Sequence, residues 1–384
     1  MSAEDLPEPD REGDAPHPRH STKLVGQAAA EATFLEAHTG GKLHHAWLIT
    51  GPRGVGKATL AWRIARFLLA SPMDSDAGLF GAPEPPATLD TDPDHPVARR
   101  MAALTEGRLF LLRRGPTDKG DRLSADLRVA EVRKLQNFFT MSATEGGRRV
   151  VIVDTVDEMT DQAANALLKM LEEPPRDATL LLISHQPARL LPTIRSRCRV
   201  LRCAPLGPDD LARALAPLGV DTGDAGGLAA LAGGSVGTAL RLAEMDGLQT
   251  YAALTNLFDG APGIDRPAAL RLADSVAGKA SEARFDMLVT LIDIFLARLA
   301  HAGIAGPPDP EIVPGEATVL ARLAPDAQAA RVWAGLQQRL GNRARAGRAV
   351  NLDPAALVLD MLLSVDTAAA PPPETPAAPP QGAR

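Results

Sequence analysis

The chain has 384 residues, of which 45% are hydrophobic, and this is enough to fill the cores of two or three domains. A formal net charge of −6 excludes a uniformly basic protein that coats nucleic acid, and two cysteines are too few for a disulfide scaffold. Because the sequence contains no run of about 18 uncharged apolar residues, we expect a cytoplasmic protein with no membrane partner.

The first 22 residues are rich in proline, acidic residues and histidine, and they show no hydrophobic periodicity. Such a composition buries too little apolar surface to offset the entropy lost on ordering, so we expect a disordered tail over residues 1–22. Apolar positions between residues 23 and 39 then predict a short helix that ends near Gly40.

A strand, a glycine-rich loop and a helix are predicted between residues 45 and 60, because a short apolar run leads into glycines and apolar residues then recur at helical spacing. Gly51, Gly54 and Gly56 leave backbone N–H groups free to converge on an anion. Lys57 adds a positive charge where the helix begins. This pattern predicts a P-loop, the phosphate-binding loop of a site for ATP or ADP.

The residue after Lys57 departs from the P-loop motif. The motif has a Ser or Thr there as a magnesium ligand, whereas this chain has Ala58 and carries the hydroxyl one position later, on Thr59. One position along a helix is about 100° of rotation, so Thr59 would not point toward the ion unless the loop slipped. The nucleotide site is therefore degenerate, and a loop that binds no ligand stays open as the alternative.

Apolar runs at 109–112, 150–153 and 179–183 predict buried strands of a parallel sheet, and so an α/β fold. Asp154 ends the second run, at the carboxyl end of a strand, where such sheets bind ligands. In active P-loop ATPases a Glu commonly follows this Asp and prepares the attacking water. Here the next residue is Thr155, which cannot act as a base near pH 7.

Two groups of charged residues follow. Asp157 and Glu158 come soon after the strand, and helix capping is their expected role. Arg195, Arg197 and Arg199 lie within one short helix or turn. Because the planar fork of arginine suits phosphate oxygens, we interpret these three as candidates for a phosphate contact.

Strand signals stop near residue 205. From there, patterns rich in Ala and Leu predict helices, and the later ones form a helical bundle. The last residues are dominated by Ala and Pro, which indicates a linker-like tail. The expected segments are a tail over 1–22, an α/β P-loop domain over 23–205, a small helical domain over 206–264, an all-α domain over 265–366 and a tail over 367–384.

Three motifs together resemble one known family, the delta-prime subunits of the bacterial DNA polymerase III clamp loader, within the AAA+ superfamily. They are the loop at 51–57, the run AANALLKMLEEPP at 163–175, and LPTIRSRC at 191–198, which is similar to the Ser-Arg-Cys motif of clamp-loader subunits. The resemblance covers about residues 23–365. It implies a RecA-like AAA+ domain, a helical lid and a helical collar through which subunits assemble.

The resemblance also implies a function. Clamp loaders are five-membered arcs, with gamma/tau and delta as the other subunits, that use ATP to open a ring-shaped sliding clamp and place it on primed DNA. They belong to a DNA-directed DNA polymerase, so the nucleotidyltransferase activity resides in the whole complex. In such an arc Arg197 would act in trans as an arginine finger in a neighbour's ATP site, an effect worth roughly 10³ to 10⁵ in rate.

Departures from the active members of the family imply little or no intrinsic ATPase activity. Ala58 replaces the magnesium ligand and Thr155 replaces the base. Residues 233–240 resemble the second sensor segment, with Thr238 where an arginine would touch nucleotide. ATP or ADP with Mg²⁺ would therefore occupy at most a degenerate site. Many delta-prime chains carry a four-cysteine zinc module, but residues 71–100 contain no cysteine, so no zinc is expected.

Two alternatives stay open. The first is a self-sufficient ATPase motor of the gamma/tau kind that uses Lys57 and Asp154 with Asp157 or Glu158 as base. The second is a DNA-binding module, since a helix near the C-terminal end carries several arginines; a charged stripe of this kind is more often a solvated helix face. These residues are Arg339, Arg343, Arg345 and Arg348.

Overall fold

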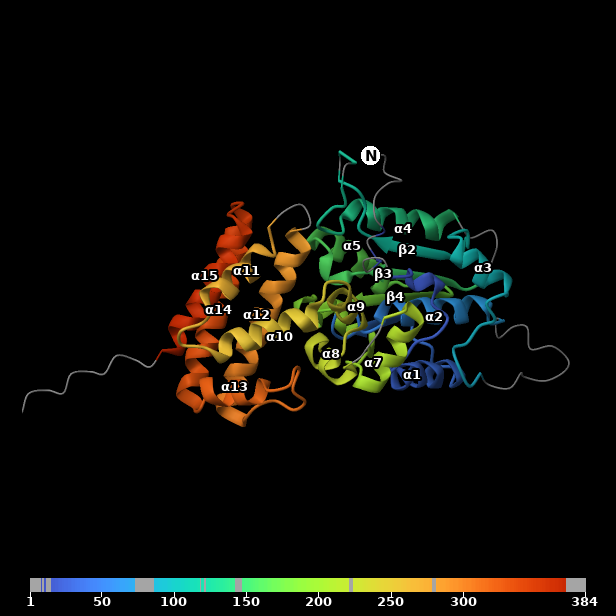
Figure 1. Cartoon of the computed structure of the whole chain (residues 1–384). Helices are drawn as coiled ribbons and strands as arrows, with labels where there is room; N and C mark the ends of the chain where they lie inside the picture. Colours follow the sequence, from blue (N-terminus) through green and yellow to red (C-terminus); the bar gives the residue numbers. More distant parts are fainter. Residues whose placement is uncertain are drawn as a thin grey trace, which may run out of the picture. The chain divides into compact units, whose positions relative to one another are not determined.

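The computed structural model describes residues 8, 10–11, 15–72, 86–117, 119–120, 122–141, 147–220, 224–277 and 281–370. The chain forms two compact units, Met1–Ala225 with Ala232–Leu240, and Gly226–Leu231 with Arg241–Arg384 (Figure 1). Helices α8 (Ala225–Ala232) and α9 (Val236–Glu244) contribute residues to both units. The division therefore differs from the predicted boundaries near residues 205 and 264, because the start of the predicted lid belongs to the same unit as the P-loop.

The first unit is built on a five-stranded sheet of order β2-β3-β4-β1-β5, in which all neighbouring strands are parallel. The strands are β1 (Ala46–Thr50), β2 (Leu109–Arg113), β3 (Arg149–Asp154), β4 (Ala178–Ser184) and β5 (Arg199–Arg202). All residues of β1 and β4 are buried, as expected for central parallel strands. The predicted α/β fold with a parallel sheet is confirmed. Strand β5 was not predicted, because it is a short edge strand in which only Leu201 is buried.

Helices cover both faces of this sheet. They are α1 (Ala28–Thr39), α2 (Lys57–Ala70), α3 (Pro96–Ala102), α4 (Val129–Met141), α5 (Asp161–Glu172), α6 (Pro192–Ser196) and α7 (Pro208–Leu215). Leu48, Val151 and Leu182 belong to one core with residues of α4, α5 and α6. On the other face Trp47 packs against Phe34 of α1, with ring centroids 5.0 Å apart, and α2 contacts β1, β3 and β4 (Figure 1). The strands thus hold the P-loop helix rigidly in place.

Residues 15–22, which composition assigned to a disordered tail, are ordered against α2. They include a 3₁₀ turn, Pro18–His20, and His17 is 3% exposed with its ring edge-on to that of Trp62. The guanidinium of Arg66 donates to the carbonyl oxygen of Arg19 at 2.8 Å. The order of this segment depends on partners supplied by α2, so its own composition could not reveal it.

The second unit is helical, as predicted. Its main helices are α10 (Gly247–Asp259), α11 (Arg266–Asp274), α12 (Ser281–Ala305), α13 (Glu316–Leu323), α14 (Ala327–Ala349) and α15 (Pro354–Ala369). Helix α12 packs along α14 and also contacts α10, α13 and α15. Helix α15 continues past residue 366, where the collar was predicted to end, because alanine-rich sequence supports a helix as well as a linker. The rest of the predicted C-terminal tail, from residue 371, lies outside the described residues.

Helix α12 is the one helix of the described residues that is long and apolar enough to cross a membrane, over Glu282–Ala305. Core helices of soluble proteins pass the same test. The apolar positions that predicted this helix are buried here, among them Leu288, Ile292 and Phe295. Its composition is therefore explained by the core of the helical unit.

Candidate functional site

The P-loop lies at the carboxyl edge of the sheet, where it connects β1 to α2. In the strand register Thr50 pairs with Ser184, and Arg113 pairs with Asp154, so the polar ends of four strands meet at this edge. Lys57 begins α2, and it and Asp154 influence each other's pKa. The structure thus brings Lys57 and Asp154, which the sequence placed in one site, to the same edge of the sheet.

The ammonium group of Lys57 is turned into its own loop. Lys57 is 3% exposed, and its Nζ donates to the carbonyl oxygen of Gly51 at 2.8 Å and to that of Pro52. Burial lowers the pKa of Lys57 to about 8, with a smaller contribution from Arg53, although Cys203 and nearby carboxylates oppose the shift. A lysine has three N–H donors. Since the loop carbonyls take two of them, a phosphate would have to displace these contacts.

The predicted second sensor segment packs directly on the P-loop. The backbone N–H of Gly237 donates to the carbonyl oxygen of Gly54 at 3.3 Å. A Cβ atom on Gly54, where φ is +75°, would lie 2.3 Å from the hydroxyl oxygen of Ser235. Thr238 stands where the family has an arginine, and its N–H donates to the same hydroxyl at 3.1 Å. Gly54 is therefore required for close internal packing, whether or not the loop binds an anion.

Asp154 is half-buried at the end of β3, where two acids and two cations influence its charge. Burial raises the pKa of its carboxyl to about 7, and the negative charges of Asp10 and Glu158 raise it further, against the opposing effect of Lys57 and Arg53. A magnesium ligand must be ionised. Burial thus opposes the ionised form that a magnesium ligand requires.

Asp157 and Glu158 do not cap a helix, so the predicted role is wrong. Thr160 is the N-cap of α5, where its hydroxyl accepts from the N–H of Ala163 at 3.3 Å. Asp157 instead accepts from the hydroxyl of Ser184 at 2.7 Å, and from the backbone N–H groups of His185 and, at 3.1 Å, Gln186.

Glu158 forms ion pairs with Arg53 at 3.1 Å and with Arg114 at 2.9 Å. Together with the contacts of Asp157, these pairs hold both carboxylates in place. A general base must reach the water that it activates. Neither acid is therefore free to serve as the base that Thr155 cannot provide.

His185 is a residue at this edge that sequence reasoning missed. It follows β4, and burial together with Lys57 and Arg53 lowers its pKa to about 4, so it is neutral at physiological pH. Its backbone N–H is held by Asp157. The only signal in the sequence was a polar pair, Ser184 and His185, at the end of an apolar strand, and this pattern did not distinguish a site from a strand end.

The residues at this edge do not fit a magnesium-bound triphosphate. Ala58 offers no hydroxyl and Thr59 lies one position further along α2, while the donors of Lys57 are used inside the loop. Among the described residues, no group of three or more His, Cys, Asp and Glu side chains could hold a metal ion. The residues that would supply a magnesium ligand and a base for hydrolysis are therefore replaced at this edge.

The three clustered arginines lie elsewhere and have three different environments. The guanidinium of Arg199 lies over the ring of Trp47, 5.1 Å from its centroid. Arg195 is exposed and reaches only the carbonyl oxygen of Pro187, at 3.4 Å. Arg197, at the end of α6, forms an ion pair with Glu172 at 2.9 Å, with 36% of its side chain exposed. Arg197 is thus both oriented by a carboxylate and accessible from outside the subunit.

The arginines near the C-terminal end are largely engaged within the helical unit. Arg343 pairs with Asp360 at 3.1 Å, and Arg348 pairs with Asp286 and, at 3.3 Å, with Glu282. These acids neutralise two of the four arginines that suggested DNA binding, and Arg345 contacts Asn342 on its own helix. The structure therefore gives that alternative no support.

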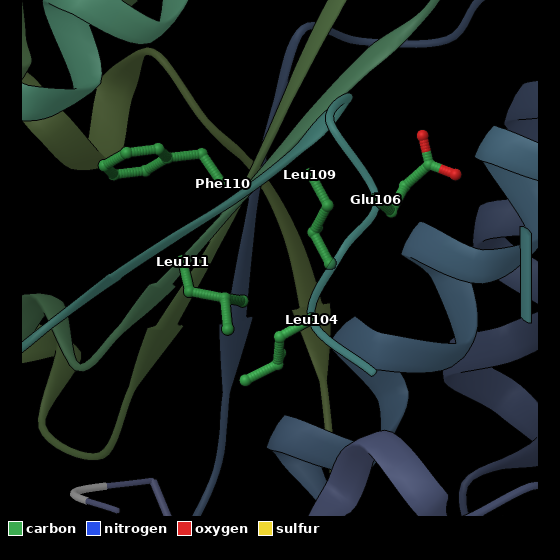
Figure 2. A pocket seen from close by; sticks show the side chains of 5 residues that line it. All are labelled: Leu104, Glu106, Leu109, Phe110 and Leu111. Atoms are coloured by element: carbon green, nitrogen blue, oxygen red, sulfur yellow. The ribbon is translucent and has the colours of Figure 1, made fainter. Parts of the chain in front are cut away.

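A pocket of about 200 Å³ lies at the edge strand β2 (Figure 2), whereas the P-loop follows β1, which lies between β4 and β5. It is lined by Leu104, Glu106 and the first three residues of β2. Its one acid, Glu106, is already paired with Arg100 at 2.8 Å and Arg108 at 2.9 Å. The pocket therefore offers an apolar hollow without catalytic groups.

The sheet order, with the P-loop after the interior strand β1 and an acid at the end of β3, defines a P-loop domain of the AAA+ class. A family model described as DNA polymerase III, delta subunit, matches residues 26–207. The DNA polymerase III subunit delta' of Pseudomonas aeruginosa is 39% identical over 214 residues, which cover 54% of this chain and 59% of that protein. Over residues 26–207 the chain is therefore similar to the delta-prime subunits of DNA polymerase III.

Two further relatives support this assignment. The subunit delta' of Escherichia coli is 32% identical over 218 residues, which cover 56% of this chain and 59% of that protein. The subunit gamma/tau of Mycobacterium bovis is 30% identical over 187 residues, which cover 47% and 28% of the two chains. The match thus spans less than two thirds of each relative, and the delta' proteins are more similar than the gamma/tau protein.

Proposed function

We propose that this chain is a non-hydrolysing delta-prime subunit of a DNA polymerase III clamp loader, and that it supplies Arg197 as an arginine finger to a neighbouring subunit's ATP site. The observation that carries this proposal is the contrast between two cations. Arg197 is exposed with N–H donors available to a partner, whereas Lys57 has turned its donors into its own loop. One site is arranged to act on another subunit, and the other is closed on itself.

The residues missing from the P-loop edge support the same conclusion. Ala58 and Thr155 remove the magnesium ligand and the base, while Asp157 and Glu158 are held in other contacts. ATP or ADP with Mg²⁺ would therefore bind weakly in a degenerate site, and turnover by this chain alone would be negligible. This is the property of a rigid assembly subunit rather than a motor.

The proposed partners are the gamma/tau and delta subunits in a five-membered arc in the cytoplasm. The sliding clamp and primed DNA would be reached through the complex, since two of the four arginines of α14 that could contact DNA, Arg343 and Arg348, are paired with acids. In this arrangement the chain contributes to clamp loading, while nucleotidyl transfer belongs to the polymerase that the clamp serves.

The proposal is tested by reconstituting the loader with Arg197→Ala in this chain. Because an arginine finger stabilises charge that develops on the transferred phosphate, we expect ATP turnover to fall by about 10³-fold at the site that receives it. Arg195→Ala is the matched control, since Arg195 lies on the same helix and is not paired with a carboxylate. Unchanged turnover and clamp loading with Arg197→Ala would exclude the finger.

A self-sufficient motor of the gamma/tau kind is the second candidate, favoured by the presence of Lys57 and Asp154 at one edge of the sheet. It requires a base that the contacts of Asp157 and Glu158 do not leave free. Phosphate release by the purified chain decides between the two. Turnover that is brisk and lost in Lys57→Ala would establish the motor and replace our proposal.

A further inference from the structure

Helix α5 ends with two carboxylates, and negative charge is unfavourable at the C-terminal end of a helix. Glu172 is its last residue, and Glu173 is its C-cap, so two carboxylates lie at the negative end of the helix dipole. Acids are disfavoured at this end, where lysine or arginine would be stabilising. Glu173 is exposed and forms no ion pair within the described residues, whereas Glu172 forms an ion pair with Arg197. Only one of the two acids therefore has a compensating partner.

The guanidinium of Arg197 is held at two different nitrogens. One terminal nitrogen forms an ion pair with Oε1 of Glu172 at 2.9 Å, and the other donates a hydrogen bond to the backbone carbonyl oxygen of Thr193 at 3.1 Å. Two anchors on separate nitrogens fix both the position and the plane of the fork. Since a guanidinium carries five N–H donors, the remaining ones stay available on the exposed side.

The backbones that carry the pair are fixed to one another. Ile194 of α6 is 1% exposed and belongs to the same core cluster as Leu171, which precedes Glu172 and is 2% exposed. Pro174 follows the C-cap of α5, so this helix cannot extend beyond the residues that carry the pair. The separation of Glu172 and Arg197 is thus set by the core rather than by two flexible surface loops.

We infer that Glu172 is a positioning residue for Arg197: it holds the guanidinium in the orientation in which the remaining donors meet the phosphate of a neighbouring subunit. This inference rests on the proposed function of Arg197. Glu172 touches no substrate and acts through the arginine alone. An arginine already held in place loses less conformational freedom when it engages the phosphate, which makes its contribution to the transition state larger.

The test compares two adjacent acids in the reconstituted loader. Glu172→Ala removes the anchor, and Glu173→Ala is the matched control at the next position of the same helix end. Alanine is a good helix former, and removal of an acid from a helix C-terminus relieves its clash with the dipole. Both variants should therefore melt within about 3 °C of the wild type, so a loss of turnover cannot be assigned to misfolding.

We expect Glu172→Ala to lower kcat of the loader about three- to tenfold, with KM for ATP unchanged, because the anchor matters when the finger engages charge in the transition state. Glu173→Ala should leave both constants unchanged. In an Arg197→Ala background, Glu172→Ala should have no further effect, because its only route of action is gone. Glu172→Gln, which keeps an acceptor oxygen, should recover part of the loss.

Three experimental outcomes distinguish a failure of the proposed function of Arg197 from a failure of the positioning role of Glu172. If Arg197→Ala itself has no effect, the proposed function fails. If Arg197→Ala is deleterious but Glu172→Ala matches Glu173→Ala, the positioning role fails while the finger stands. An increase in kcat with Glu172→Ala would also overturn the inference, because it would show that the carboxylate restrains the arginine instead of orienting it.

Discussion

Replacement of Asp154 by Asn should stabilise the protein at neutral and alkaline pH. The carboxyl at the end of β3 is half-buried, and burial raises its pKa from 3.8 to about 7, assisted by Asp10 and Glu158. In the unfolded chain the same group ionises near its ordinary value. Between these two pKa values the native state therefore binds more protons than the unfolded state, so stability falls as pH rises.

The magnitude follows from the size of the shift. A difference of about three pKa units at about 1.36 kcal/mol each gives an upper bound of about 4 kcal/mol. Below about pH 3 the carboxyl is protonated in both states, and at pH 4 the difference has only begun to develop, so Asp154→Asn should change the free energy of unfolding little there. Above pH 7 the full penalty of the buried charge is present, and the variant should be more stable by up to about 4 kcal/mol.

Urea unfolding between pH 4 and pH 8.5 measures this difference. Trp333→Phe provides a suitable background, because the remaining tryptophans, Trp47 and Trp62, both lie in the unit that contains Asp154. Asp157→Asn is the matched control from the same loop, and it should lose about 1.5–3 kcal/mol, because Asp157 accepts hydrogen bonds from three donors. If Asp154→Asn were neutral or destabilising at pH 8, the carboxylate would be well compensated and the reasoning would be refuted.

Two further predictions concern buried groups away from this site. Glu316 is fully buried in the helical unit and accepts hydrogen bonds from Arg298, Tyr251 and the N–H of Ile312. Glu316→Ala should therefore lower the free energy of unfolding by about 3–5 kcal/mol, whereas Tyr251→Phe should lower it by only about 1 kcal/mol. Urea unfolding followed by tryptophan fluorescence compares the two variants, and equal losses would contradict the network. Burial raises the thiol pKa of Cys198 to about 12 and that of Cys203 to about 11. The native protein should therefore react with a thiol reagent at pH 8 far more slowly than the urea-unfolded protein. Equal reaction rates would contradict the burial of the thiols.

The sequence predicted those parts of the fold whose signals are local. The strand before the P-loop, the helix after Lys57 and the apolar strand ending in Asp154 are each written in consecutive residues, and the structure contains all three. Strand β5 could not be recognised, because an edge strand of four residues with arginine at both ends looks like a basic turn. Residues 15–22 were missed because α2 supplies the groups that order them.

In the candidate site, too, some features have a local sequence signal and others do not. Ala58 and Thr155 could be identified as losses from the P-loop pattern by position alone. The direction of the Lys57 amine could not be predicted, because it depends on the conformation of the loop carbonyls. The contact between Gly237 and Gly54 joins segments far apart in the chain, and a single sequence carries no signal for such a contact. The pairing of Arg197 with Glu172 was hidden for the same reason.

The central claim is that this subunit serves its neighbour's ATP site without hydrolysing ATP in its own. It is tested most directly by ATP turnover of the complete loader in which only this chain carries Lys57→Ala, with the mass of the complex measured to confirm assembly. We predict turnover within about twofold of the wild type, because Lys57 contacts its own loop and takes no part in hydrolysis. A loss of turnover in a correctly assembled complex would contradict the account.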